Sequence, residues 1–411
     1  MTHANDRQSN RRTVWLMLLA LCTAFMLSQS YRTAAAILAP ELQASLGFTP
    51  QQLGVFAASF HFAFGAMQLF MGIGIDLHGI RRTVLTAFPL AIAGALLSAL
   101  THEFGLLVLG QVLIGVGCAP AFLVCTVFIA RCFPASRFAA VSGLAMGIGG
   151  LGMLLTGTPL AWLVHTHSVQ AGFAMLCALS VLAWSVVYVG VREPAAPKAT
   201  GPRATVWQAI GQFGQLLRLP QTPGILALSA VSYAAFITLR GLWLGPLLVE
   251  RFQFSLIASG NVALVVSLVS LVGPPLFGRI DPGVARRRRW IVGYTLFMAT
   301  LFLLLAFTHA VLLALGLLVL CGFLTGYIVL QYADVRSAYP EAQTGRAMAA
   351  FTMAMFLGIA LMQWITGIVA TVAKTHGMDA YTAVLLSVAA LLSAGAAAFA
   401  WLPSPRSRPA S

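Results

Sequence analysis

Long apolar runs separated by short polar breaks make up most of this 411-residue chain. A helix needs about 20 apolar residues to cross the hydrocarbon core of a bilayer. Twelve runs are near that length, so the pattern predicts an all-α membrane protein with twelve transmembrane helices. Their expected limits are 14–39, 51–75, 83–101, 105–130, 138–164, 171–191, 222–249, 255–279, 290–308, 311–335, 346–373 and 380–402.

The longest polar break lies between the sixth and seventh runs and is rich in Pro, Lys and Arg. Because it separates six apolar runs from six others, we expect two six-helix bundles joined by a cytoplasmic linker. The predicted parts are an N-terminal bundle at 1–191, the linker at 192–220, a C-terminal bundle at 221–402 and a cytoplasmic tail at 403–411.

The two halves resemble each other at a constant offset of 206 residues. Repeats of this kind in transporters place a substrate site near the bilayer midplane, between the halves. The matched pairs are Pro40 with Pro246, Phe48 with Phe254, Gly54 with Gly260, and Gly72 with Gly278.

Composition places the apolar runs in a membrane rather than in a soluble core. Hydrophobic residues make up 59% of the chain and charged residues only 8%, whereas soluble domains carry about 25% charged residues. The mean hydropathy is +0.90. The six cysteines are scattered along apolar runs without the paired spacing of a metal site, so we expect neither a metal nor a cofactor.

The formal net charge is +14, and the basic residues are concentrated in alternate loops. Twenty of the 24 Lys and Arg residues lie in those loops or near the chain ends, whereas the intervening loops hold only Arg251 and Lys374. By the positive-inside rule, both termini of this multi-pass protein face the cytoplasm, and we expect it in a bacterial inner membrane. Contact with the lipid bilayer accounts for the charge, so no nucleic-acid partner is expected.

The loop between the second and third runs carries a dense set of glycine and charged residues. Glycine allows close helix approach and tight turns, and arginines at this position can bond helix ends or the nearby carboxylate. The loop reads Gly72-Ile-Gly-Ile-Asp76-Leu-His-Gly79-Ile-Arg81-Arg82. It closely resembles the signature loop of the major facilitator superfamily, although Leu77 stands where that family usually has a basic residue.

The resemblance covers the whole chain, because the length, the twelve runs, the central linker and the half-repeat also agree. It implies a secondary transporter that works by alternating access, with residues 72–82 as a cytoplasmic latch between the bundles. A degraded second copy runs from Gly278 to Asp281, followed by Arg286 to Arg289. The resemblance also implies a small-molecule substrate and no enzymatic activity, and we expect a monomer.

Two arginines, Arg32 and Arg240, lie inside the first run of each half, far from other charges. A cation at that depth costs at least about 2.5–3.5 kcal/mol on insertion scales, so it marks a candidate site. A guanidinium matches the planar geometry of a carboxylate or phosphate. The placement resembles organophosphate/phosphate antiporters and, for the first helix, anion–cation symporters, which implies a small organic anion as substrate. Snorkelling of both side chains to the outer interface is the structural alternative.

Helical spacing gives each arginine polar or aromatic neighbours. Gln29 shares a helix face with Arg32, and Tyr233 and Trp243 share one with Arg240. We therefore expect these side chains to line the substrate site. The alternative is that they hold neighbouring helices together.

The tenth run carries a polar stripe at helical spacing, formed by Tyr327, Gln331 and Asp334. We expect Tyr327 and Gln331 to contact the substrate. Asp334 lies near the cytoplasmic end of the run, as does Arg336, so we expect an ion pair between them in a cytoplasmic gate. That gate would also include the latch residues Gly72, Asp76, Gly79, Arg81 and Arg82.

His61 is the only histidine well inside an expected span. Histidine titrates near neutral pH, so His61 is the candidate for coupling transport to a proton, with another coupling ion left open. The alternative is a neutral histidine that bonds across helices. No Asp or Glu lies clearly at mid-membrane, so a proton relay built on carboxylates is poorly supplied.

A second function remains open at this point: proton-coupled efflux of apolar or cationic drug-like compounds. It is favoured by the many Phe and Met residues and by the glycine-rich fifth run, Gly147 to Pro159, which loosely resembles a motif of drug–proton antiporters. Two cations that face a cavity and the lack of a buried acid argue against it. Close helix packing explains the glycines equally well.

Overall fold

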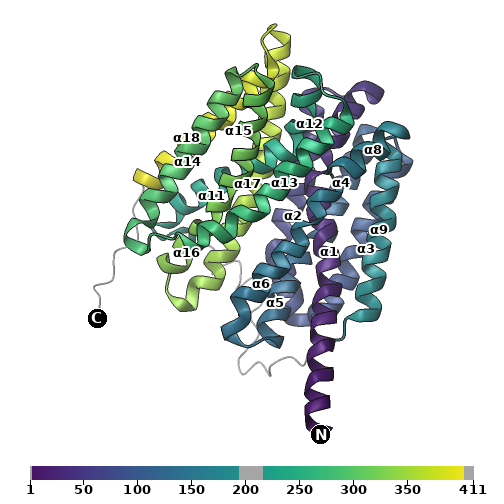
Figure 1. Cartoon of the computed structure of the whole chain (residues 1–411), viewed down its shortest axis with the longest axis vertical. Helices are drawn as coiled ribbons and strands as arrows, with labels where there is room; N and C mark the ends of the chain where they lie inside the picture. The colour runs from purple at the N-terminus through teal and green to yellow at the C-terminus, as the bar shows by residue number, and fades with distance from the viewer. Residues whose placement is uncertain (1, 194–215, 402–411) are drawn as a thin grey trace.

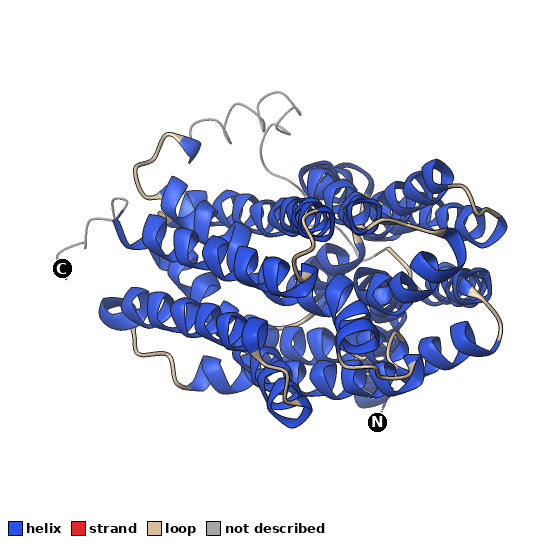
Figure 2. Ribbon diagram, turned by 90° about the horizontal axis from the view of Figure 1, so that it is seen from above, coloured by secondary structure: helices blue, strands red, loops and turns tan. Residues whose placement is uncertain are grey.

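The computed structural model describes residues 2–193 and 216–401 of the chain. Within these residues every regular element is helical, and Figure 2 shows helices joined by loops and no strand. Most of the predicted linker, residues 194–215, and most of the C-terminal tail lie outside the described residues.

The helices before residue 194 build the first six spans. The fourth span is interrupted before Ala121, and the fifth is broken into three short helices. The elements are α1 (Thr2–Leu46), α2 (Pro50–His78), α3 (Ile80–Leu100), α4 (Phe104–Cys118), α5 (Ala121–Cys132), α6 (Ala135–Gly150), α7 (Gly152–Leu155), α8 (Thr158–Thr166) and α9 (Val169–Gly190).

The helices after residue 215 build the other six spans. The seventh contains two π-helical turns, and the tenth a short 3₁₀ turn. The elements are α11 (Thr222–Thr238), η1 (Leu239–Trp243), α12 (Leu244–Pro246), η2 (Leu247–Arg251), α13 (Leu256–Arg279), α14 (Val284–Phe307), α15 (Val311–Leu324), η3 (Thr325–Tyr327), α16 (Ile328–Ala338), α17 (Glu341–Thr375) and α18 (Ala380–Trp401).

The membrane class predicted from the sequence is confirmed. Eleven stretches of the described residues are long and apolar enough to cross a membrane, and α2 is a further helix of 29 residues. Helices of both halves are drawn side by side in Figure 1, where the N-terminal segment of α1 extends below the rest. Together they give the twelve spans expected of the fold.

The first helix runs well past its expected end at residue 39. It continues to Leu46 with Pro40 inside it. Proline has no N–H, so Pro40 cannot donate to the carbonyl of Ala36 one turn earlier. Gly245 packs against this position, and a Cβ there would overlap the Ala36 oxygen. The proline that suggested a helix end therefore marks the point where the seventh span comes closest to the first.

The two sets of helices meet at the end of the molecule opposite the latch loop, which we define as residues 72–82. At this closed end, α2 packs along α17, α1 along η1 and α12, and α8 along α13. A Cβ at Gly54 would lie 2.6 Å from the Gln363 carbonyl oxygen, so the α2 and α17 backbones nearly touch. In Figure 1, α12 and α13 lie near the top, close to α8, whereas α16 and α5 stand apart at the bottom.

Glycines nearer the latch loop have a different environment. A Cβ added at Gly147, Gly278 or Gly345 would meet no atom within 4 Å. These glycines lie on α6, α13 and α17, which are spans that carry close contacts between the halves farther along their length. Within the described residues, the halves are therefore packed at the closed end and separated toward the latch loop.

The close approach at Gly245 can be tested by substitution. We expect Gly245→Val to destabilise the protein by about 1–3 kcal/mol, because the side chain would push α1 away from the seventh span. The matched control is Gly316→Val on α15, where an added Cβ meets nothing within 4 Å. Thermal unfolding of the purified variants in detergent measures the difference. Equal unfolding temperatures for the two variants would contradict the contact.

Candidate functional site

Arg32 lies on α1, is 7% exposed, and its guanidinium contacts two aromatic rings that pack against each other. Its guanidinium carbon is 4.5 Å from the centroid of Phe64 and 4.7 Å from that of Phe356. The two ring centroids are 4.4 Å apart. Because Phe64 belongs to α2 and Phe356 to α17, the arginine lies where the two halves of the chain meet. Snorkelling to an interface is incompatible with this burial.

The hydrogen-bonding capacity of Arg32 is largely unused. Its Nη2 donates to Ser28 Oγ at 3.5 Å, which is at the limit for a hydrogen bond, and its Nε has no partner. Gln29, one turn earlier, is buried, and its Oε1 is also unpartnered. No ion pair forms with Arg32 among the residues that the structure describes. A buried guanidinium whose N–H groups lack partners can bind a carboxylate or phosphate group.

His61 joins α2 to α17 close to Arg32. Its Nδ1 lies 3.0 Å from Gln363 Oε1 and 3.2 Å from the Ala57 carbonyl oxygen. Both atoms are acceptors, so in a neutral ring Nδ1 carries the proton and Nε2 is left as an acceptor. That Nε2 has no partner, and neither has Nε2 of Gln363. The sequence did not point to Gln363, which is fully buried.

Arg240 is also fully buried, but its donors are occupied. It lies in the π-helical turn η1 and donates from Nε to Ser267 Oγ at 2.9 Å. Its Nη2 reaches the carbonyl oxygens of Met153 at 3.2 Å and Thr156 at 3.4 Å. Only its Nη1 lacks a partner. Arg240 therefore crosses from the second half of the chain to the first.

The partners of Arg240 come from a break in the fifth span. The short helix α7 ends at Leu155, and α8 begins at Thr158. At this break the Met153 carbonyl accepts from Thr156 Oγ1 at 3.0 Å and can accept a second hydrogen bond from Arg240. A cation at a helix C-terminus is also favoured by the helix dipole. The glycine-rich segment that loosely resembled an efflux motif thus forms a docking site for Arg240.

The other predicted neighbours divide into two groups. Tyr233 interacts with Arg32, whereas the hydrogen bonds of Arg240 go to Ser267, Met153 and Thr156. Gln331 is buried, accepts from Ser232 Oγ at 2.9 Å and keeps a free Nε2. Tyr233 can therefore contact a ligand in the Arg32 region, whereas Gln331 lines a small cavity in the second half together with Asp334.

Trp243 and Tyr327 are already bonded to neighbouring helices. Trp243 donates from Nε1 to Thr366 Oγ1 at 2.9 Å, and the Tyr327 hydroxyl lies 3.0 Å from Thr295 Oγ1. Both rings are buried. Their observed contacts are those of residues that hold helices together, which was the alternative reading of such side chains.

The latch loop is fastened by a residue that the sequence did not indicate. Glu193 accepts hydrogen bonds from the backbone N–H groups of Ile80 at 2.9 Å and Arg81 at 2.8 Å, at the start of α3. A carboxylate is favoured there by the helix dipole. The turn before α3 has Gly79 at φ +86°, a value that favours glycine. The side chain of Asp76 lies outside the described residues, and a Cβ at Gly72 would lie 3.9 Å from Leu123, which is an ordinary van der Waals contact.

In the expected cytoplasmic gate, Asp334 does not pair with Arg336. Asp334 forms its ion pair with Arg288, at 3.2 Å, whereas Arg336 is exposed. The physical reason is helical geometry: residues two apart in a helix point to different faces, so Arg336 cannot reach Asp334. The gate residue that the sequence missed is thus Arg288.

The loop after α13 reproduces the latch turn of the first half. Gly283 has φ +79°, close to the value at Gly79. Arg287 donates to both carboxylate oxygens of Asp281, at 3.0 Å from Nε and 2.7 Å from Nη2. These hydrogen bonds hold the pKa of Asp281 below its ordinary value. The structural repeat is therefore clearer than the sequence repeat in this loop.

Comparison with known proteins gives one family over most of the chain. The model of the Major Facilitator Superfamily matches residues 19–363. A solved nucleoside transporter, NupG, superposes with a TM-score of 0.72 at 16% identity, covering 94% of this chain and 99% of that one. At this identity the superposition concerns the fold alone.

Two curated relatives are matched over parts of their length. The chain is 22% identical over 200 residues to the "Probable sulfoacetate transporter SauU" of Cupriavidus necator, covering 49% of this chain and 46% of that protein. It is 24% identical over 174 residues to the "Hexuronate transporter" of Bacillus subtilis, covering 42% of this chain and 40% of that protein. The chain thus spans less than half the length of each relative.

The different surroundings of the two arginines predict different effects on stability. Arg240→Ala would remove the side-chain donor of the Thr156 carbonyl and leave the Met153 carbonyl with Thr156 Oγ1 alone, and we expect a loss of about 2 kcal/mol. Arg32→Ala should cost less, because it removes one long hydrogen bond and an uncompensated charge. Thermal unfolding in detergent without substrate measures both. A greater loss for Arg32→Ala than for Arg240→Ala would overturn this assignment of roles.

Proposed function

The chain belongs to the major facilitator superfamily of transporters, and on that premise we propose that it moves a small organic anion across the membrane by alternating access. The observation that carries the proposal is the buried Arg32, which has no acidic partner among the described residues. The anionic group of the substrate, a carboxylate or an organophosphate, would supply the missing charge. The names of the two curated relatives, which refer to organic anions, support the same class.

Charge compensation is the physical basis of this proposal. Moving one ion out of water costs several kcal/mol even after the protein relaxes, and a partner must offset that cost. A guanidinium stays protonated in a protein, so neutralisation by loss of a proton is not open to Arg32. A bound anion that forms two parallel hydrogen bonds to the fork would lower the free energy of the occupied site.

The unpartnered polar atoms near Arg32 define what else the substrate carries. Arg32 Nε, Gln331 Nε2 and Gln363 Nε2 are donors without acceptors, so they favour a ligand rich in oxygen. Gln29 Oε1 and His61 Nε2 are acceptors without donors, so they favour at least one hydroxyl group on the same ligand. We therefore propose a hydroxylated organic acid held by Arg32, Gln29, Tyr233 and Gln331.

Arg240 has a different part in the proposed cycle. Its bonds to the end of α7 hold the halves together at the closed end, and only Nη1 remains for a substrate. If the latch loop faces the cytoplasm, as the basic loops indicate, the structure is the inward-open state. Opening to the other side would then break the bonds between Arg240 and α7. Residues 1–191 and 221–402 would move as the two bundles.

Efflux of cationic compounds has less support in the structure. The segment that suggested it provides carbonyl groups for Arg240. Asp334 on α16 is the buried acid among the described residues, and it is paired with Arg288. A cationic substrate would also have to bind beside the uncompensated charge of Arg32, which is electrostatically unfavourable.

Uptake into proteoliposomes tests the sign of the substrate. We expect saturable uptake of small hydroxylated carboxylates and none of lipophilic cations. Arg32→Ala should lower anion uptake by about 30-fold or more, the effect of removing one partner of a buried charge pair. Arg32→Lys keeps the charge but loses the planar fork, so it should recover only part of the activity. Arg218→Gln, at an exposed position before α11, is the matched control.

Two outcomes would contradict the anion site. One is saturable anion uptake that survives in both Arg32→Ala and Arg240→Ala. The other is saturable uptake of lipophilic cations by the wild type that increases in Arg32→Ala, because removal of the positive charge would then have relieved repulsion.

The coupling role of His61 can be separated from its structural bond. Asparagine places an N–H near the position of Nδ1, so His61→Asn keeps a donor to Gln363 but removes the acceptor Nε2. If His61 binds the coupled proton, His61→Asn should abolish substrate accumulation driven by a pH gradient. Substrate exchange measured at the same pH inside and outside the vesicles should be kept. Unchanged pH-driven accumulation in a folded His61→Asn variant would exclude that role.

A further inference from the structure

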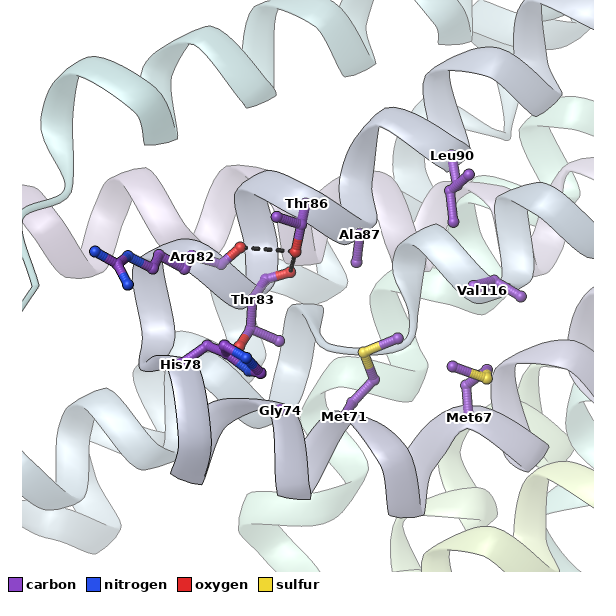
Figure 3. Close-up of a pocket in the computed structure, with 10 residues that line it drawn as sticks. All are labelled: Met67, Met71, Gly74, His78, Arg82, Thr83, Thr86, Ala87, Leu90 and Val116. Atoms are coloured by element: carbon purple, nitrogen blue, oxygen red, sulfur yellow. Dashed lines mark hydrogen bonds between the residues drawn. The ribbon is translucent and has the colours of Figure 1, made fainter. Parts of the chain in front are cut away.

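Two adjoining cavities lie on the outer side of the first half, away from Arg32. The more apolar one, of about 440 Å³, is lined by residues of α2, α3 and α4. Figure 3 shows Met67, Met71, Leu90 and Val116 along one end of it, with His78 and Arg82 at the other. Leu90 is 38% exposed, so this cavity opens on the apolar surface that faces the bilayer.

The second cavity, of about 550 Å³, continues from the first, because His78 and Arg82 line both. Arg81 and Arg192 add two further guanidinium groups to its wall. The one acidic group that lines it, Glu193, is bonded to the backbone at the start of α3. The wall therefore has an excess of positive charge at the end of the membrane-spanning helices.

Arg82 and Arg192 have no acidic partner among the described residues, and both are exposed. Arg81 differs, since it donates to the Tyr188 carbonyl oxygen at 2.9 Å and its guanidinium lies over the Tyr188 ring. The guanidinium groups of Arg82 and Arg192 thus remain free to bind an anion. Both line the second cavity, and Arg82 also lines the apolar one.

We propose that the two cavities together form a binding site for one anionic phospholipid. An acyl chain would lie in the cavity between α2, α3 and α4, and the phosphate would bind Arg82 and Arg192. A free phosphate would leave the apolar part unfilled, and the cationic headgroup of a zwitterionic lipid would offset its phosphate charge beside the two guanidinium groups. Basic residues near a membrane surface each contribute to the binding of anionic lipid. No residue of the Arg32 region lines the site, although Arg81 and Arg82 of the latch loop do, so the proposal adds a lipid ligand to the proposed transport function.

Lipid retention measured by native mass spectrometry tests the proposal. The purified full-length protein is titrated with phosphatidylglycerol or phosphatidylcholine of the same chain length. Arg82→Gln should weaken phosphatidylglycerol binding about fivefold, the effect of one basic group near a surface. Thr86→Trp, at an exposed position that lines the apolar cavity, should weaken it by filling the space for the chain. Arg279→Gln, an exposed arginine in the second half, is the matched control and should bind as the wild type does.

Three results would overturn the proposal. The first is equal retention of the two lipids by the wild type, because the basic wall would then have no effect. The second is unchanged phosphatidylglycerol binding in both Arg82→Gln and Thr86→Trp. The third is displacement of the lipid by inorganic phosphate, which would indicate a site for a soluble anion. If Thr86→Trp lowers the unfolding temperature, Arg82→Gln alone decides between these results.

Discussion

The rest of the site depends on one constraint, which is that a guanidinium is held out of water without a counterion. The rings of Phe64 and Phe356 offset part of the cost, but a desolvated cation–π contact contributes about 2 kcal/mol. Desolvation of one ion costs several kcal/mol. The part of the desolvation cost that the cation–π contacts do not offset remains as long as the site is empty. An anion that enters the region of Arg32 is therefore stabilised by a charge that the protein has already buried.

The repeat places two arginines in related helices, yet the protein compensates their charges in different ways. Arg240 lies against carbonyl oxygens at a helix break, so most of its hydrogen-bonding capacity is filled by the protein. Arg32 faces aromatic rings, which stabilise a cation but accept no directed hydrogen bond from Nε. The first arrangement holds two halves together. The second leaves a charge that a ligand can reach.

Sequence reasoning succeeded where one residue or a simple periodicity carries the information. Apolar length predicted the spans, and spacing predicted the latch glycine at Gly79. It failed where the outcome depended on contacts between distant segments. Nothing in a linear pattern shows that Phe356 closes over Arg32 or that Glu193 fastens the latch loop. Likewise, helical spacing put Tyr233 on the face of Arg240 and did not show that it interacts with Arg32.

The contacts around Arg32 also connect recognition to movement. One ring over the guanidinium belongs to α2 and the other to α17, and the bond from His61 to Gln363 joins the same two helices. A movement that parts these helices at the closed end separates the rings and exposes the cation. The free energy of the empty site therefore depends on conformation, whereas a bound anion compensates the charge in either state. Binding of the substrate's negative charge and opening of the closed end thus both change the surroundings of Arg32.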